Sequence, residues 1–147
     1  MRVEIDQSGR IEFTGTDTVL AYSDDKQYAI LIPSIVKREI VRKYRKTVKA
    51  KIFFLKLFSV CLFLLIKNDL NKLDEIVIDI EFEGREKDIK NMLLNHIRKI
   101  DPKFPKHKIL FRRITKESRA HKLALSVFRD AVKENKVITT KEIEELL

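Results

Sequence analysis

Apolar and polar positions alternate near the start of the chain, a period of two that is typical of β-strands. The alternation runs from Val3 to Phe13 with a turn or bulge at 7–9, and predicts a first strand that resumes after this interruption. Further strands are predicted at 18–22 and 28–32, separated by a turn at 24–26. Three successive strands joined by short connections indicate an antiparallel meander.

Helical spacing begins at Pro33-Ser34, where a proline and a serine are typical of a helix start. Apolar residues then recur at every fourth position, at Ile40, Tyr44, Val48 and Ile52. No glycine or proline occurs from 34 to 68, but a single helix of that length would measure about 50 Å, too long for this chain. We therefore expect two helices, or a bend near Ala50.

Strands and helices alternate in the second half of the chain. Strands are predicted at 75–82 and 108–114, and helices at 87–100, at 115–134 and, as a short last element, from Thr139 or Thr140. The order β-β-β-α-β-α-β-α, with a terminal helix, implies parallel pairing in this half. The sequence thus predicts one α/β domain over 1–147, with a mixed five-stranded sheet and helices on its faces.

Charge is the most informative feature of the composition. The chain carries 31 Lys and Arg against 22 Asp and Glu, a formal net charge of +9. Such an excess indicates an anionic partner such as nucleic acid. The same composition is typical of the charged surface of a thermophilic protein, and the two interpretations carry about equal weight.

The chain has one cysteine, Cys61, and three histidines, which excludes a disulfide framework and a Cys/His metal cage. Met1 begins a strand pattern rather than a signal peptide, so we expect a cytoplasmic protein. The apolar run 52–66, interrupted by Lys56, spans about 22 Å as a helix, against about 30 Å for a bilayer core. It predicts a buried helix and no membrane span, and a homodimer is one way to cover it.

Acidic residues cluster on two of the predicted strands. Glu4 and Asp6 share one face of the first strand, and Asp79, Glu81 and Glu83 share one face of the fourth. If these strands are parallel neighbours, their carboxylates gather at the carboxyl end of the sheet, where open α/β sheets bind ligands. Such an oxygen-rich site suits Mg²⁺ or Mn²⁺. A solvated sheet face is the simpler alternative.

The order of elements resembles that of the ribonuclease H-like superfamily, over nearly the whole chain. Val3–Gly9 is similar to the first strand of that family, with Asp6 at its end; Ile76–Phe82 is similar to the fourth strand. Lys116–Ala124 resembles the start of the last core helix. In that family, acidic residues from these three elements converge on divalent metals.

The resemblance implies a divalent-metal-dependent nuclease, a hydrolase of phosphodiesters that uses two metal ions. Asp6 would bridge the ions and Glu81 would bind one of them, with Asp79 as a weaker candidate. Many members place an acid where this chain has His121, and Glu117 stands one turn earlier. On one helix these two side chains would point the same way, to supply a third ligand or to shuttle a proton.

Two basic groups would bind the phosphates of a nucleic acid. Basic residues crowd the stretch 37–51, where the candidates are Arg38, Arg42, Arg45, Lys46 and Lys49. A second group surrounds the start of the last core helix: Arg112, Arg113, Lys116 and Arg119. Phosphate contacts of this kind are salt-sensitive and independent of sequence. Besides the nuclease, a non-catalytic nucleic-acid-binding module and a dimerising scaffold of the same fold remain alternatives.

Overall fold

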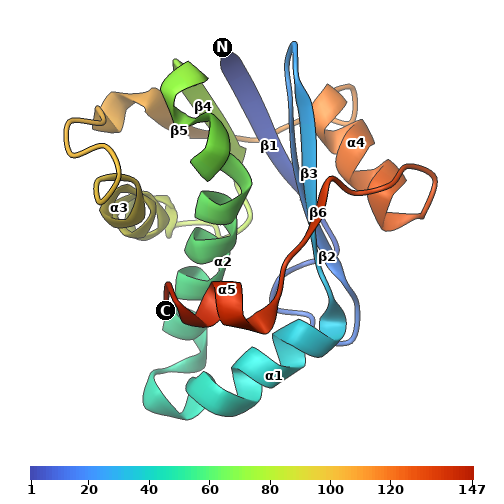
Figure 1. The fold of residues 1–147 in the computed structure, drawn as a ribbon, viewed down its shortest axis with the longest axis vertical. Helices are drawn as coiled ribbons and strands as arrows, with labels where there is room; N and C mark the ends of the chain where they lie inside the picture. The colour runs from blue at the N-terminus through green and yellow to red at the C-terminus, as the bar shows by residue number, and fades with distance from the viewer.

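A computed structural model describes residues 1–46 and 48–147 with their side chains. Across these residues, six strands form one mixed sheet with helices on both faces (Figure 1). The strand order is β5-β4-β1-β2-β3-β6, with bounds β1 Arg2–Ser8, β2 Thr18–Ser23, β3 Gln27–Ile32, β4 Glu75–Asp79, β5 Ile109–Arg112 and β6 Lys136–Val137. The predicted mixed α/β class is confirmed. The sheet has one strand more than predicted, because the two residues of β6 pair with the end of β3.

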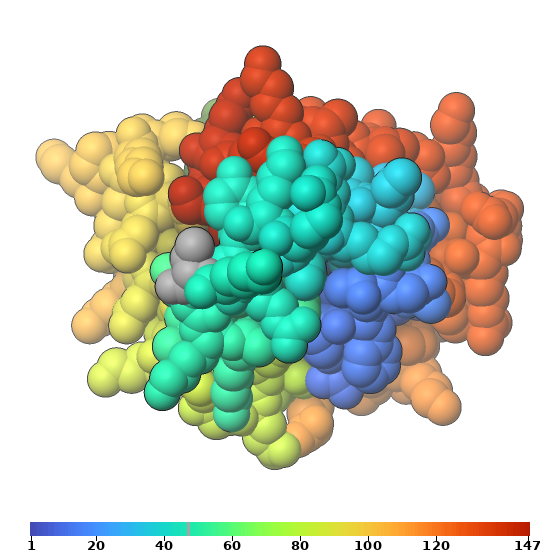
Figure 2. All heavy atoms as spheres, turned by 90° about the horizontal axis from the view of Figure 1, so that it is seen from below, coloured from blue at the N-terminus to red at the C-terminus, as the bar shows by residue number. Residues whose placement is uncertain are grey.

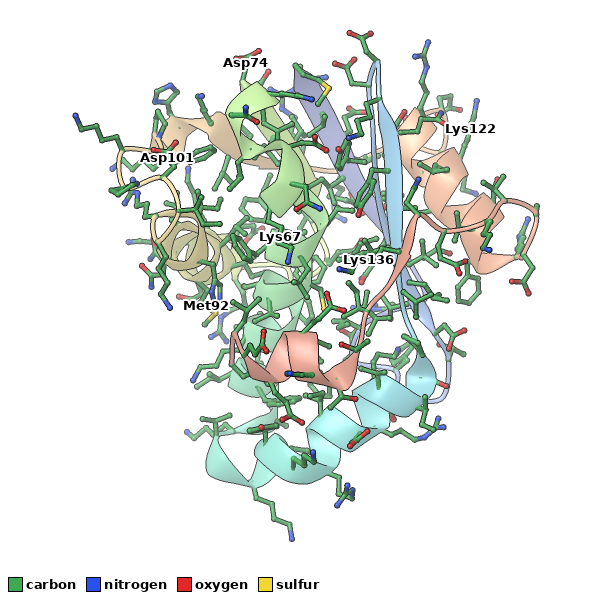
Figure 3. All side chains as sticks on the ribbon, viewed as in Figure 1. Lys67, Asp74, Met92, Asp101, Lys122 and Lys136 are labelled. Carbon is green, nitrogen blue, oxygen red and sulfur yellow. The ribbon has the colours of Figure 1, made fainter. Side chains whose placement is uncertain are left out.

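The direction of the strands decides which residues meet. β1, β2 and β3 form the predicted antiparallel meander, while β4 runs parallel to β1 with Ile78 beside Ile5, and β5 runs parallel to β4. β1, β3, β4 and β5 therefore all end at the same edge of the sheet. This end lies at the bottom of Figure 1, where the chain leaves β3. Asp74 and Asp101 lie at the opposite end (Figure 3).

The first strand is shorter than predicted, because β1 ends at Ser8 and residues 9–17 form a loop. Gly9 has φ +77°, and a Cβ atom there would lie 2.1 Å from the Asp17 carbonyl oxygen, so only glycine fits this turn. Beyond it, the Phe13 N–H donates to the Arg10 carbonyl in a tight turn. Ile11 is buried and Phe13 is exposed, so their alternation reflects burial in a loop and not a strand.

The long helical segment is divided as predicted, into α1 (Ser34–Tyr44) and α2 (Ala50–Ile66), with a short 3-10 turn η1 (Arg45–Thr47) between them. α2 is apolar nearly all round, apart from the exposed Lys51 and Lys56, and packs against the sheet, α3 (Glu86–Ile97) and α5 (Thr140–Glu144). Most side chains of 52–66 are therefore covered within the chain, with Lys56 exposed, and the homodimer stays a prediction. Among the described residues, no helix is both long and apolar enough to cross a bilayer.

α4 (Arg119–Phe128) packs against the other face of the sheet, over β1 and β2. Its close approach is possible because the strands present small residues there: Ala21 and Ala29 contact Leu123, Ala124 and Val127. The predicted helix 115–134 was too long at both ends. It begins after Ser118, whose side chain caps the Ala120 N–H. It ends at Phe128 because Asp130 has a left-handed backbone conformation (φ +60°) and the Ala131 N–H donates to the Ser126 carbonyl oxygen, which closes the helix terminus.

Further short elements complete the chain. The 3-10 turns η2 (Lys67–Lys72) and η3 (Lys106–Lys108) precede β4 and β5. The predicted last helix is present as α5, and Thr139 and Glu142 form a capping box at its start. β4 ends at Asp79, three residues earlier than predicted, because the chain turns from there into the start of α3.

Candidate metal centre and its basic surroundings

Three carboxylates meet where β1 and β4 end. Asp6 lies near the end of β1, Asp79 is the last residue of β4, and Glu81 follows two residues later. One carboxylate oxygen from each lies within 4.8 Å of the others. The oxygens around a Mg²⁺ ion, at 2.0–2.1 Å from it, are at most about 4 Å apart. Adjustments of about 1 Å would therefore let all three residues bind one ion.

Burial makes this cluster unfavourable without a counter-charge. Asp6 is 4% exposed. Burial raises its pKa, and the neighbouring Asp79 carboxylate adds to the effect. Burial also raises the pKa of Glu81 to about 8, again reinforced by Asp79 and Asp6. Near neutral pH, Glu81 thus keeps a proton that a divalent cation would displace, as expected of a metal site.

His121 holds the buried Asp6 in place. Its Nδ1 atom lies 2.7 Å from Asp6 Oδ2, and the Gln7 N–H donates to Asp6 Oδ1 at 2.9 Å. α4 is tied to the same strand one turn earlier, where Ser118 Oγ donates to Glu4 Oε1 at 2.9 Å. His121 therefore contacts the central carboxylate and orients it, and it is not among the three residues that converge as ligands.

Two positioning contacts escaped the sequence analysis. Asp79 Oδ1 accepts a hydrogen bond of 2.7 Å from the Ile114 N–H, which ties the chain after β5 to the site. Gln7 lies close enough to lower the pKa of Glu81, yet its enclosed amide atoms make no hydrogen bond of ordinary geometry among the described residues. An enclosed amide without a partner is costly, and it fits a site that holds a further polar group. The one sequence feature that could have identified Gln7 as part of the site is its position next to Asp6.

Two predicted acidic residues lie apart from the centre. Glu117 precedes α4 and is exposed, so it does not share a helix face with His121, contrary to prediction. It lines a separate recess of about 400 Å³ that also includes Arg2 and Glu4. Glu83 is exposed and pairs with Arg113 at 2.7 Å. The carboxylates that converge are therefore those of Asp6, Asp79 and Glu81.

A basic recess of about 460 Å³ adjoins Glu81. The cationic residues that line it come from four separate segments: Arg10, Lys51, Arg85 and Arg113. Arg10 contacts the backbone of Glu81, since its Nη2 lies 3.4 Å from the Glu81 carbonyl oxygen. Of these cations, Arg113 was a predicted phosphate-binding residue and Lys51 closes the predicted basic stretch 37–51, whereas Arg10 and Arg85 carried no such signal. Arg10, Arg85 and Arg113 also pair with carboxylates, those of Glu12, Asp88 and Glu83. The recess thus offers several cationic hydrogen-bond donors to a phosphate, which would compete with these ion pairs.

The predicted basic stretch on α1 lies at the same end of the molecule. Figure 2 views this end, with α1 beside the loop 9–17 and the start of α2. The candidate residues for phosphate binding are exposed there: Arg38, Arg42, Arg45, Lys46 and Lys49. Lys37 belongs to the same sequence cluster but is fully buried. The exposed face therefore contains fewer basic residues than the cluster along the sequence.

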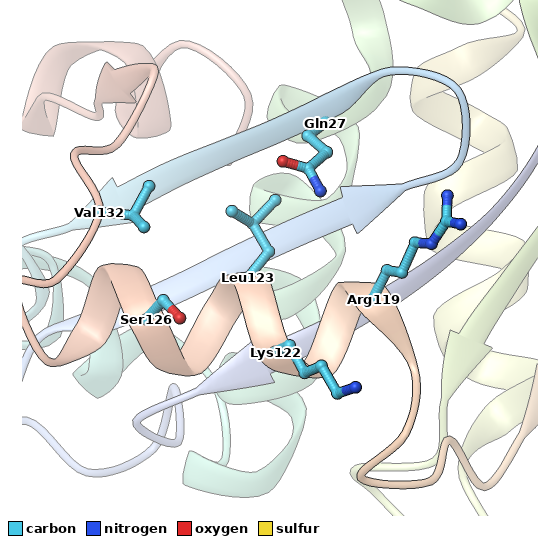
Figure 4. Close-up of a pocket in the computed structure, with 6 residues that line it drawn as sticks. All are labelled: Gln27, Arg119, Lys122, Leu123, Ser126 and Val132. Carbon is cyan, nitrogen blue, oxygen red and sulfur yellow. The ribbon is translucent and has the colours of Figure 1, made fainter.

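The second predicted basic group surrounds the start of α4. Arg112, Arg113, Lys116 and Arg119 are all exposed. Arg119 and Lys122 line a cavity of about 340 Å³ between α4 and the β2–β3 hairpin, together with Gln27, Leu123, Ser126 and Val132 (Figure 4). This cavity lies along the outer flank of α4. It extends the cationic surface but contains none of the three converging carboxylates.

Comparisons with known proteins find no relationship. No family model, no curated protein and no solved structure matches this chain. The site must therefore be interpreted from its own geometry.

Proposed function

We propose that this protein is a divalent-metal-dependent nuclease, a hydrolase of nucleic-acid phosphodiesters with a divergent ribonuclease H-like architecture. The observation that carries the proposal is the convergence of Asp6, Asp79 and Glu81 at the ends of two parallel strands. The basic recess beside Glu81 is the second support, because it can hold a phosphate next to the carboxylates.

The architecture supports the same proposal. The mixed α/β sheet is compatible with the proposed architecture, with β1 between β2 and β4. Two features depart from it: a sixth strand, and a histidine on α4 that contacts Asp6 where many members carry an acid. These departures are why we describe the architecture as divergent.

Each residue has a defined task in the proposed reaction. Asp6, Asp79 and Glu81 would hold Mg²⁺ or Mn²⁺, which supplies the Lewis acidity that activates water and stabilises charge on phosphate oxygens. His121 orients Asp6 and, beside it, can accept or return a proton. Arg10 and the other cations of the recess would hold the substrate phosphate through charge-assisted hydrogen bonds.

The second candidate function is a nucleic-acid-binding module without catalysis. It is favoured by the exposed basic face of α1, which lies beyond the carboxylates and needs no metal to attract phosphates. The two functions differ in one measurable respect: only the nuclease requires Asp6 to be ionised and bound to a cation.

The deciding experiment is titration of Mg²⁺ and Mn²⁺ into the wild type and Asp6→Asn by calorimetry, followed by cleavage assays on labelled RNA, DNA and hybrid substrates. The matched control is Asp25→Asn, an exposed acid in the β2–β3 turn at the other end of the sheet. We expect metal-dependent cleavage by the wild type and the control, and none by Asp6→Asn, with all three folded by circular dichroism. Equal cleavage by Asp6→Asn would refute the proposed centre; nucleic-acid binding without cleavage by any of them would leave the binding module.

A further inference from the structure

An aromatic side chain stands in solvent beside the candidate metal centre. Phe13 lies in the β1–β2 loop, with 57% of its surface exposed. Single exposed apolar residues are common, so exposure alone carries no argument. The relevant observations are how firmly the loop is held and what lies next to the ring.

The loop that carries Phe13 is anchored by a buried charge. The Phe13 carbonyl accepts a hydrogen bond of 2.6 Å from Lys37 Nζ, which also donates to Thr18 Oγ1 at 2.9 Å. Lys37 is fully buried, and this burial lowers its pKa to about 8. Arg38 donates to the next carbonyl, that of Thr14, at 3.1 Å. Two residues of α1 thus hold the backbone of the loop that carries the exposed ring.

Arg10 connects this ring to the site. Its guanidinium carbon lies 5.5 Å from the centre of the Phe13 ring, and its Nη2 lies 3.4 Å from the Glu81 carbonyl oxygen. Glu12 pairs with Arg10 Nε and holds the guanidinium in this position. The ring, the guanidinium, the basic recess and the carboxylates therefore follow one another along one edge of the molecule.

We infer that Phe13 is a stacking platform for one base of a single-stranded nucleic acid, whose neighbouring phosphate occupies the recess formed by Arg10, Lys51, Arg85 and Arg113. Proteins bind single strands by combining aromatic rings with a cationic groove, since every base has a face to stack, and Phe13 beside Arg10 offers one such ring. Within a duplex, neighbouring bases cover both faces, so this ring selects unpaired nucleotides. The inference rests on the proposed function for its substrate class, and it narrows that class to single strands.

A protein partner is the competing occupant for an exposed phenylalanine. The charge of the surroundings favours nucleic acid, because the recess next to the ring is cationic and opens beside a site that can hold a divalent cation. Both features attract phosphate, and neither selects an apolar protein surface.

The test measures binding without metal, so it is independent of cleavage. Fluorescence anisotropy in EDTA would follow a labelled oligothymidylate and a labelled duplex with the wild type, Phe13→Ala and Phe13→Tyr. The matched control is Ile100→Ala, which removes an equally exposed apolar side chain (60%) that is next to Asp101, at the end of the molecule away from α1. We expect Phe13→Ala to bind the single strand about 5- to 100-fold more weakly, with the duplex affinity unchanged. Phe13→Tyr and Ile100→Ala should bind as the wild type does.

A second measurement reports stacking directly. The chain contains no tryptophan, so Phe13→Trp introduces a single indole fluorophore whose emission a stacked base would quench. We expect quenching by the oligothymidylate and little by the duplex. The inference is overturned if Phe13→Ala binds single strands as tightly as the wild type, if both substrates weaken equally, or if the indole emission of Phe13→Trp does not respond. These binding results do not depend on the proposed nuclease activity and would stand if no cleavage were observed. Conversely, negative binding results for Phe13 would not change the dependence of cleavage on Asp6.

Discussion

Replacing Glu81 by Gln should stabilise the metal-free protein at neutral pH. Burial raises the pKa of Glu81 from 4.5 to about 8. The folded protein therefore keeps this proton up to about pH 8, whereas the unfolded chain releases it above its ordinary pKa. Between pH 4.5 and 8, each pH unit stabilises the unfolded state relative to the folded state by about 1.4 kcal/mol. At pH 7 the free energy of unfolding is therefore lower by about 3 kcal/mol than it is below pH 4.5. The stability contributed by the Glu81 proton is fully present below pH 4.5 and is lost as the pH rises toward 8.

Glutamine does not titrate, so Glu81→Gln should be free of this loss. At pH 7 in EDTA we expect a melting temperature about 5–10 °C above that of the wild type, and at pH 4 no difference. Scanning calorimetry at both pH values measures this. The control is Glu83→Gln, because the Glu83 side chain is 80% exposed and should melt as the wild type does in each buffer. Adding MgCl₂ should then stabilise the wild type and leave Glu81→Gln unchanged, because the variant lacks a ligand.

The result that would refute this reasoning is simple to recognise. If Glu81→Gln melts at or below the wild-type temperature at pH 7 in EDTA, Glu81 is ionised there without strain. The three carboxylates would then be ordinary solvated side chains at the edge of the sheet, and the proposal of a metal centre would be refuted.

Three further predictions concern the surroundings of the centre. His121→Ala removes the hydrogen bond that lowers the pKa of Asp6. The Mg²⁺ affinity measured by calorimetry should therefore fall about tenfold, and the pH above which Mg²⁺ binds should rise. An unchanged affinity would show that His121 does not orient the ligand. Lys37→Met leaves the loop carbonyls and the buried Thr18 hydroxyl without their donor. Urea unfolding should therefore show a free energy of unfolding about 2–3 kcal/mol lower than that of the wild type. A decrease below about 0.5 kcal/mol would contradict the anchoring role. Charge reversal of Arg42 and Lys46 together should weaken nucleic-acid binding measured by anisotropy. The slope of log affinity against log salt concentration should fall by the equivalent of about two to four phosphate contacts. An unchanged slope would exclude α1 from the interface.

Much of the fold could be predicted because it is encoded in local patterns. The meander follows from period-two alternation in the first strand and from two short apolar segments separated by a turn. The division between α1 and α2 follows from a helical segment too long for one domain. The errors occur where contacts with distant residues decide the local structure. Ile11 and Phe13 alternate as in a strand, but the turn at Gly9 and the anchoring by Lys37 make them a loop. α4 ends early, at Phe128, where Asp130 has a left-handed backbone conformation.

The candidate site divides in the same way. The sequence by itself determined that acids stand at the ends of β1 and β4, that the chain is strongly basic, and that α2 is apolar nearly all round, since these properties belong to residues in order along the chain. Only the tertiary structure decided that Glu117 lies outside the centre, that Lys37 is buried while Phe13 is exposed, and that Arg10, Lys51, Arg85 and Arg113 share one recess. The physical reason is that burial, charge repulsion and hydrogen-bond partners depend on distances between segments, which are set by packing and not by sequence separation.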